Sequence, residues 1–158
     1  MMTSEDQWCE VDYRLLREQA RALLSGQMHQ VANAANLSAL IFQEIPGLNW
    51  AGFYFLEGDT LMLGPFQGKP ACVSIPVGGG VCGTAAALGK NQRVENVHDF
   101  DGHIACDVDS MSELVIPLFK KGRVFGVLDL DSPVPSRFSA RDEEGVAALA
   151  RVFEASVA

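Results

Sequence analysis

The 158-residue chain lacks a long apolar run and lacks the features of a secretion signal. A membrane-spanning helix needs roughly 18 consecutive apolar residues, and no stretch approaches that length. The N-terminal segment MMTSEDQWCEVD is polar and acidic, whereas a signal peptide has a basic end followed by an apolar core. The sequence therefore predicts a cytoplasmic protein with no membrane partner, in a compartment that keeps cysteines reduced.

Positive charge is also scarce. The chain has 12 Lys and Arg against 20 Asp and Glu, a formal net charge of −8, and its longest basic run is Lys120-Lys121. A protein that binds nucleic acid normally presents a basic patch to the phosphates. No nucleic-acid partner is therefore expected, and the acidic balance favours ligands that carry an ammonium group.

Motifs for metals and phosphates are missing as well. The cysteines are Cys9, Cys72, Cys82 and Cys106; they form no CxxC pair, and nine and 23 residues separate the last three. Zinc sites usually pair their ligands at short spacing, so no metal is expected. The glycines at 78–80 lack the lysine of a phosphate-binding loop, so no nucleotide cofactor is expected either. The thiols are left open between inert packing and redox chemistry.

What the sequence does contain is the pattern of one α+β domain over residues 1–158. Its length and its 48% apolar content suit a single hydrophobic core. Apolar periodicity predicts helices over 9–24, 28–44 and 81–88, and Ser139 with Asp142 predicts a capped helix to about residue 155. Strands are expected over 49–56, 60–63, 72–75, 93–97, 113–119 and 123–130, with loops over 64–70 and 99–109.

This order of elements predicts a mainly antiparallel sheet, because strands and helices do not alternate as in a doubly wound fold. The N- and C-terminal helices should cover one face and leave irregular loops over the other. The clearest unit is a hairpin, for which we predict a three-residue loop 120–122 with glycine in its left-handed third position. Its core face would then hold Leu114, Ile116, Leu118, Val124, Leu128 and Leu130.

Three carboxylates gather on the other face of this hairpin. Asp129 and Asp131 are two residues apart on one strand, so their side chains share a face. The predicted register places Glu113 opposite Asp129. The cluster is either a solvated outer surface or a pocket in which crowded carboxylates retain a proton and bind an ammonium group.

Two cysteines lie where a thiol could react. Cys106 belongs to the polar segment GHIACD rather than to an apolar run, and His103 could lower its pKa only if the loop turned the imidazole inward. Cys82 begins the predicted helix 81–88, where a helix N-terminus can stabilise a thiolate. Cys72 is an ordinary strand-start cysteine by comparison, and Cys9 has no assigned role.

Trp50 and Tyr54 share one face of the strand 49–56, opposite Ala51 and Phe53. An aromatic stripe of this kind is either part of the core or the wall of a ligand pocket. The indole N–H and the phenol O–H suit a half-wet cavity wall.

Six segments together resemble one family, the free methionine-(R)-sulfoxide reductases. They follow the family's order from about residue 32 to residue 153: NWAGFY (49–54), LGPFQGKPAC (63–72), GVCGTA (80–85), GHIACD (102–107), SE (112–113) and GVLDLDS (126–132). One such segment would be a weak signal, whereas six in order are specific.

The resemblance implies a GAF-like fold and thioredoxin-dependent reduction of free L-methionine-(R)-sulfoxide, a role in oxidative stress. It implies that Cys106 is the nucleophile, that Cys72 resolves it through a disulfide, and that Cys82 is a further redox-active thiol. By the same analogy Trp50, Tyr54, Glu113, Asp129 and Asp131 surround the substrate. GAF domains often pair through terminal helices, which leaves a homodimer open. The alternative of another class is a non-catalytic GAF module that senses a small ligand.

Overall fold

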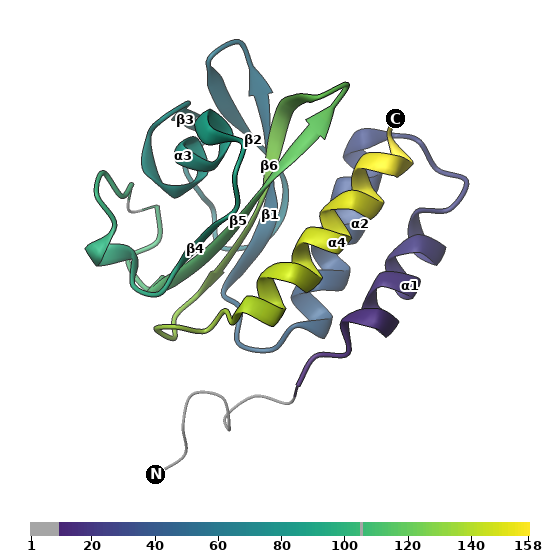
Figure 1. The fold of residues 1–158 in the computed structure, drawn as a ribbon, viewed down its shortest axis with the longest axis horizontal. Helices are drawn as coiled ribbons and strands as arrows, with labels where there is room; N and C mark the ends of the chain where they lie inside the picture. The colour runs from purple at the N-terminus through teal and green to yellow at the C-terminus, as the bar shows by residue number, and fades with distance from the viewer. Residues whose placement is uncertain (1–9, 105) are drawn as a thin grey trace.

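The structure is a computed structural model that describes residues 10–104 and 106–158 (Figure 1). Its sheet has six strands in the order β3-β2-β1-β6-β5-β4, and every neighbouring pair is antiparallel. The strands are β1 (Trp50–Glu57), β2 (Thr60–Gly68), β3 (Ser74–Pro76), β4 (Gln92–Val94), β5 (Ser112–Lys120) and β6 (Arg123–Ser132). The helices are α1 (Tyr13–Leu24), α2 (Gln30–Glu44), α3 (Gly80–Leu88), the 3₁₀ helix η1 (Val97–Asp99) and α4 (Ala140–Ser156).

The terminal helices α1, α2 and α4 lie together on one face of the sheet, and α3 lies on the other (Figure 1). The expected α+β layering is therefore confirmed. The main core forms between the sheet and these three helices, where Phe53 of β1 meets Phe153 of α4 with ring centroids 4.6 Å apart. A second apolar cluster around Trp50 and Tyr54 lies on the α3 face. The alternation predicted for β1 is thus observed residue by residue.

Polar side chains set the helix ends. The Ser139 side chain accepts a hydrogen bond from Asp142 N, and the Asp142 carboxylate accepts one from Ser139 N, so the predicted capping box is present. The first helix begins at Tyr13 rather than near residue 9, because Asp12 caps it by accepting from Leu15 N. Cys9 lies outside the described residues. No helix within the described part of the chain has the length and apolarity of a membrane span.

Three predicted strand boundaries are wrong. Strand β2 extends through 64–68, which we expected to be a loop because of its glycine and proline. That glycine and proline fall at the register shift between Gly52 and Tyr54, an irregularity that tolerates both residue types. Strand β3 begins at Ser74, so Cys72 precedes it, and β4 ends at Val94 before η1.

The β5–β6 hairpin exists, but its register differs from the prediction. The turn has two residues, Lys121 and Gly122, both with positive φ (52° and 76°), as a type I′ turn requires. A second shift of one residue occurs between Leu118 and Phe119. Together these move Glu113 opposite Asp131 instead of Asp129. The two shifts sum to an even number, so the three carboxylates keep their common face.

The same irregularity changes the face of Val124. This side chain packs against the α3-side cluster, whereas Leu114, Ile116, Leu118, Leu128 and Leu130 belong to the helix-side core as predicted. Phe125 takes the helix-side place that we expected for Val124. A bulge therefore reverses the alternation near the hairpin tip and leaves the rest of both strands unaffected.

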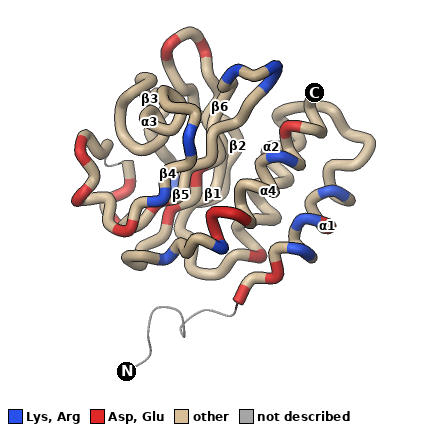
Figure 2. Tube along the Cα trace, viewed as in Figure 1, with Lys and Arg blue, Asp and Glu red and all other residues tan. Residues whose placement is uncertain are grey.

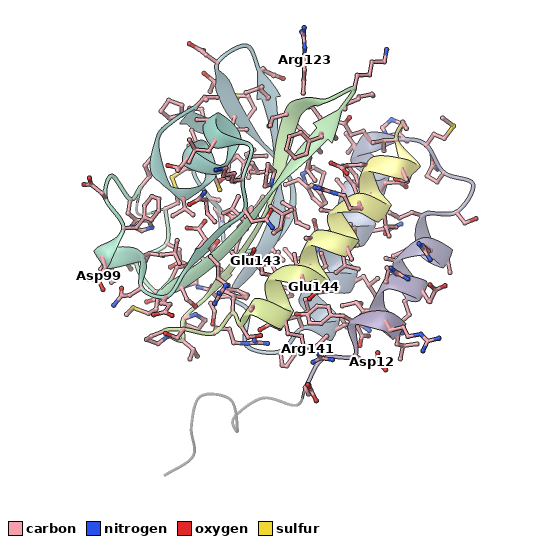
Figure 3. All side chains as sticks on the ribbon, viewed as in Figure 1. Asp12, Asp99, Arg123, Arg141, Glu143 and Glu144 are labelled. Atoms are coloured by element: carbon pink, nitrogen blue, oxygen red, sulfur yellow. A yellow bond between two sulfur atoms is a disulfide. The ribbon has the colours of Figure 1, made fainter. Side chains whose placement is uncertain are left out.

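Charged side chains lie mostly on the periphery. Asp99, Arg123 and Arg141 project outward from the molecule in Figure 3. Basic residues are dispersed over α1, the β5–β6 turn and α4 and do not form one patch (Figure 2). The absence of a nucleic-acid partner stays a prediction.

Candidate active site

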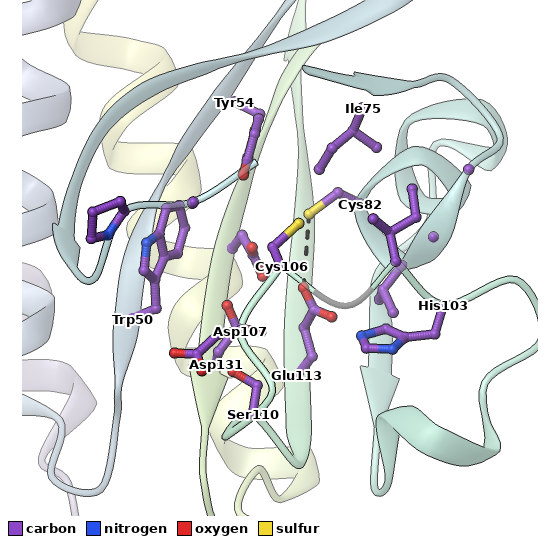
Figure 4. A pocket seen from close by; sticks show the side chains of 17 residues that line it. Trp50, Tyr54, Ile75, Cys82, His103, Cys106, Asp107, Ser110, Glu113 and Asp131 are labelled. Carbon is purple, nitrogen blue, oxygen red and sulfur yellow. Dashed lines mark hydrogen bonds between the residues drawn. The ribbon is translucent and has the colours of Figure 1, made fainter. Parts of the chain in front are cut away.

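A pocket lies on the α3 face of the sheet (Figure 4). Strands β1, β5 and β6 form its floor, the start of α3 forms one wall, and two loops close it: the Cys72 loop (69–73) and the Cys106 loop (100–111). Its lining includes seven of the eight side chains to which the resemblance gives roles, Cys72 excepted: Trp50, Tyr54, Cys82, Cys106, Glu113, Asp129 and Asp131.

Cys72 and Cys106 form a disulfide that joins the two loops across 34 residues of sequence, with Cα atoms 5.4 Å apart. Neither residue lies in a helix or strand. The protein is therefore described in an oxidised form, with the two thiols that the resemblance pairs already bonded. The bond closes over a pocket whose floor carries the carboxylates.

The Cys72 loop is fixed by side chains of β1. The Tyr54 hydroxyl donates to the backbone carbonyl of Cys72 at 3.0 Å, and Trp50 Nε1 donates to the carbonyl of Lys69 at 3.2 Å. Lys69 Nζ also pairs with Asp109 of the Cys106 loop at 3.1 Å. The polar groups of both aromatic side chains thus donate hydrogen bonds to the backbone of the Cys72 loop. Their rings stack at a centroid separation of 5.9 Å and line the pocket.

The Cys106 loop is fixed to the start of β1 by Asn49. Its amide nitrogen donates to Ser110 Oγ at 3.2 Å and to an Asp107 carboxylate oxygen at 3.4 Å. Asp107 and Ser110 both line the pocket, and sequence reasoning missed them. Asp107 ends the GHIACD segment, but Asp101 and Asp109 lie in the same loop, and no local pattern marks which of these carboxylates enters the pocket.

The three carboxylates on the pocket floor are crowded, and Glu113 and Asp129 are buried while Asp131 is half-buried. Glu113 is 7% exposed and Asp129 is 5% exposed. Burial raises the pKa of all three groups well above their usual values. Mutual repulsion adds to this, with Asp129 raising the pKa of Glu113, Asp131 that of Asp129, and Glu113 that of Asp131. The three carboxylates therefore line a pocket, and the alternative that they form a solvated outer surface of the sheet is wrong. Their raised pKa values favour the protonated forms.

Cys82 is the third residue of α3 and is buried, with its thiol 3.8 Å from a carboxylate oxygen of Glu113. Burial, then the charges of Asp129 and Glu113, raise the pKa of this thiol. The position of Cys82 at a helix N-terminus had predicted a lowered pKa for this thiol. Desolvation and neighbouring negative charge outweigh the helix dipole here, because the dipole contributes only about 0.3–1 kcal/mol in most settings.

His103 lines the pocket beside the Cys106 loop. Partial burial lowers its pKa, and repulsion from His98, whose ring centroid is 6.4 Å away, lowers it further. Both effects disfavour the imidazolium form of His103 while Cys106 is in the disulfide.

Known proteins resemble this chain in sequence and in fold. The GAF domain model matches residues 21–157. Free methionine-R-sulfoxide reductase of Escherichia coli is 54% identical over 142 residues, which cover 90% of this chain and 86% of that protein.

Two solved structures are also similar. The reduced form of fRMsr of Staphylococcus aureus aligns with a TM-score of 0.94 at 46% identity over 100% of both chains. The free methionine-R-sulfoxide reductase of Neisseria meningitidis, in complex with its substrate, aligns with a TM-score of 0.90 at 38% identity, covering 96% of this chain and 93% of that one. The chain therefore belongs to the GAF domain family and, within it, to the free methionine-R-sulfoxide reductases.

Proposed function

We propose that this chain reduces free L-methionine-(R)-sulfoxide to L-methionine, with Cys106 as the nucleophile and Cys72 as the resolving thiol. The observation that carries the proposal is the Cys72–Cys106 disulfide, formed directly over a pocket floored by three proton-retaining carboxylates. A sensing module needs neither the disulfide nor the raised carboxyl pKa values. Membership of the free methionine-R-sulfoxide reductases also supports an enzyme over a sensing module.

Binding of the substrate follows from the two sides of the pocket. The ammonium group of free methionine sulfoxide pairs with the ionised members of the Glu113, Asp129 and Asp131 cluster, because a buried negative group gains most from a desolvated cation. The apolar part of the side chain packs against the faces of Trp50 and Tyr54. We expect the two cysteine loops, which close over the pocket, to exclude a continuing peptide chain and therefore peptide-bound methionine sulfoxide.

The first chemical step needs an acid and a nucleophile. A protonated carboxyl of the cluster gives its proton to the sulfoxide oxygen, which makes the sulfur electrophilic. The Cys106 thiolate attacks that sulfur, and the oxygen passes to Cys106 as a sulfenic acid while methionine leaves. In net terms one thiol and one sulfoxide become one sulfenic acid and one thioether.

The second step restores the thiol. The Cys72 thiol attacks the sulfur of the sulfenic acid, water leaves, and the disulfide seen in the structure forms. A dithiol reductant such as thioredoxin then reduces this disulfide and is itself oxidised. Cys82, buried beside Glu113, is a further thiol that can enter the relay.

The direct test is a substrate panel. We expect turnover of the free (R)-sulfoxide with a dithiol present, none of the free (S)-sulfoxide, and none of a peptide-bound sulfoxide. Cys106→Ser should abolish turnover, while Cys9→Ser, at a cysteine with no assigned role, should not change it. Full activity of Cys106→Ser would refute the proposal, and tight ligand binding without reduction in the wild type would favour the sensing module.

The setting of the enzyme is part of the same proposal. We place it in the cytoplasm with thioredoxin as the reductant, because a catalytic disulfide must be reduced after each turnover. Replacing thioredoxin with glutathione in the assay should lower the rate. A homodimer stays a prediction, which light scattering of the oxidised protein decides.

A further inference from the structure

Cys82, Glu113 and Asp129 place three potential ligand atoms within 4.8 Å of one another, all on buried residues. The thiol of Cys82 comes from α3, Glu113 from β5 and Asp129 from β6. In Figure 4 a dashed line joins Cys82 to Glu113 at the centre of the pocket wall. Three separate elements thus converge on one point.

The spacing of these atoms can be compared with that of a tetrahedral metal site. With Zn–S distances of about 2.3 Å and Zn–O distances of about 2.0 Å, neighbouring ligand atoms lie ~3.3–3.5 Å apart. The Cys82 sulfur and the Glu113 oxygen are 3.8 Å apart, and all three ligand atoms lie within 4.8 Å of one another, so side-chain rotation must bring them closer around the cation.

An independent observation also points to a ligand. Asp129 is 5% exposed, and no described residue donates a hydrogen bond to its Oδ1 atom, which is buried. A buried carboxylate oxygen without a donor is costly, and a cation in the pocket would satisfy it. Asp129 lines the pocket, so the unsatisfied oxygen is within reach of a ligand there.

We propose that Cys82, Glu113 and Asp129 form a binding site for a divalent cation of zinc-like character. One thiolate and two carboxylates are a borderline donor set, which favours Zn²⁺ over the all-oxygen preferences of Mg²⁺ and Ca²⁺. Three protein ligands would leave one coordination position of a tetrahedral ion for water. Binding requires loss of the protons that these groups hold, so the metal also removes the acid that the sulfoxide needs.

The site does not depend on the redox state of the other thiols. Cys72 and Cys106 are bonded to each other, and among the described residues Cys82 is the one free cysteine. The oxidised protein can therefore bind the metal through Cys82. Metal and substrate ammonium would compete for Glu113 and Asp129, and this competition, unlike the metal binding itself, rests on the proposed function.

The test uses the oxidised full chain, in which Cys72 and Cys106 cannot act as ligands. Zn²⁺ is titrated against a chromophoric chelator, and Co²⁺ is added separately to look for a thiolate-to-cobalt charge-transfer band. We expect one equivalent of metal, the charge-transfer band, and a higher Tm with Zn²⁺ than without. Cys82→Ser and Asp129→Asn should each weaken binding more than about tenfold, and Cys82→Ser should abolish the band.

Two results would overturn the metal site: no metal bound by the folded wild type, or unchanged affinity and band in Cys82→Ser. Circular dichroism shows that each variant is folded, and Cys9→Ser is the matched thiol control. Adding free methionine should raise the apparent Kd for Zn²⁺. If Zn²⁺ binds through Cys82 but methionine has no effect, the metal site stands and the proposed substrate position fails.

Discussion

Neighbouring residues of one strand meet opposite environments on the two faces of the sheet. On β6, Leu128 is fully buried in the core between the sheet and the helices, while the next residue, Asp129, is 5% exposed and lies among Glu113, Asp131 and Cys82. Both side chains are removed from water. Burial of the apolar Leu128 stabilises the fold, whereas burial of the Asp129 carboxyl group costs free energy.

The difference separates stability from chemistry. The helix face buries apolar area, which stabilises the fold by roughly 25 cal/mol per Å². The pocket face buries carboxylates that must stay protonated or unpaired, which lowers stability. A bound cation would offset that cost. The buried carboxylates therefore make the pocket face favourable for binding a cation. Adjacent substitutions on β6 therefore give the sharpest way to test the contrast.

The largest expected effects come from Leu128→Ala and Asp129→Asn. Leu128→Ala leaves a cavity and should lower the free energy of unfolding by about 2–5 kcal/mol, with little change in kcat of the folded protein. Asp129→Asn should not lower the free energy of unfolding, but should lower kcat/KM by about 100-fold or more. Urea denaturation and steady-state kinetics on both variants measure this. If Asp129→Asn were destabilised and fully active, the division between a stabilising helix face and a catalytic pocket face would be wrong.

Reduction of the disulfide should have the next largest effect. Cys72 and Cys106 close a loop of 34 residues, and opening it should lower the free energy of unfolding by about 3–4 kcal/mol. Thermal unfolding with and without a dithiol measures the change. Cys72→Ser should unfold at the lower temperature under both conditions; equal Tm values for oxidised and reduced wild type would contradict the expectation.

The pH dependence of stability should be smaller and should come from the pocket face. Glu113, Asp129 and Asp131 have folded pKa values raised well above 4.5, 3.8 and 3.8. Above about pH 4 the unfolded chain has released protons that the folded protein keeps, so stability should fall as pH rises toward the raised pKa values. Denaturant titrations across this range should show a shallower fall for Asp129→Asn. Parallel curves for the two proteins would count against the raised pKa of Asp129.

The smallest expected effect concerns a single hydroxyl. Tyr54→Phe keeps the pocket wall but removes the bond to the Cys72 carbonyl, worth about 1 kcal/mol. Disulfide formation should slow by about fivefold, while methionine release in the first turnover stays unchanged. Tyr13→Phe is the matched control, because Tyr13 makes a comparable bond to Asp142 on the helix face at 2.6 Å. Equal disulfide rates in all three proteins would show that Tyr54 does not position Cys72.

Much of this contrast could be predicted from local pattern. Strand alternation alone assigns Trp50 and Tyr54 to one face and Phe53 to the other, and the order Ser139–Asp142 predicts the cap of α4. These features depend on residues close together in sequence, so the sequence carries them directly.

The remaining features depend on contacts that no local pattern contains. The two-residue turn and the shift between Leu118 and Phe119 together move Glu113 from a position opposite Asp129 to one opposite Asp131. The raised pKa of Cys82 arises first from burial and then from acids on β5 and β6, neither of which a reading of α3 alone reveals. Asp107 enters the pocket because Asn49 holds its loop, a contact across 58 residues.

The central claim is that Cys106 takes the oxygen from the sulfoxide. The most direct measurement mixes the reduced Cys72→Ser/Cys82→Ser variant with free methionine-(R)-sulfoxide, counts the methionine released, and traps sulfenic acid with a dione for peptide mass analysis. The account predicts one methionine per chain and a label on Cys106, with no further turnover. Absence of methionine, or a label on Cys9 instead, would contradict it.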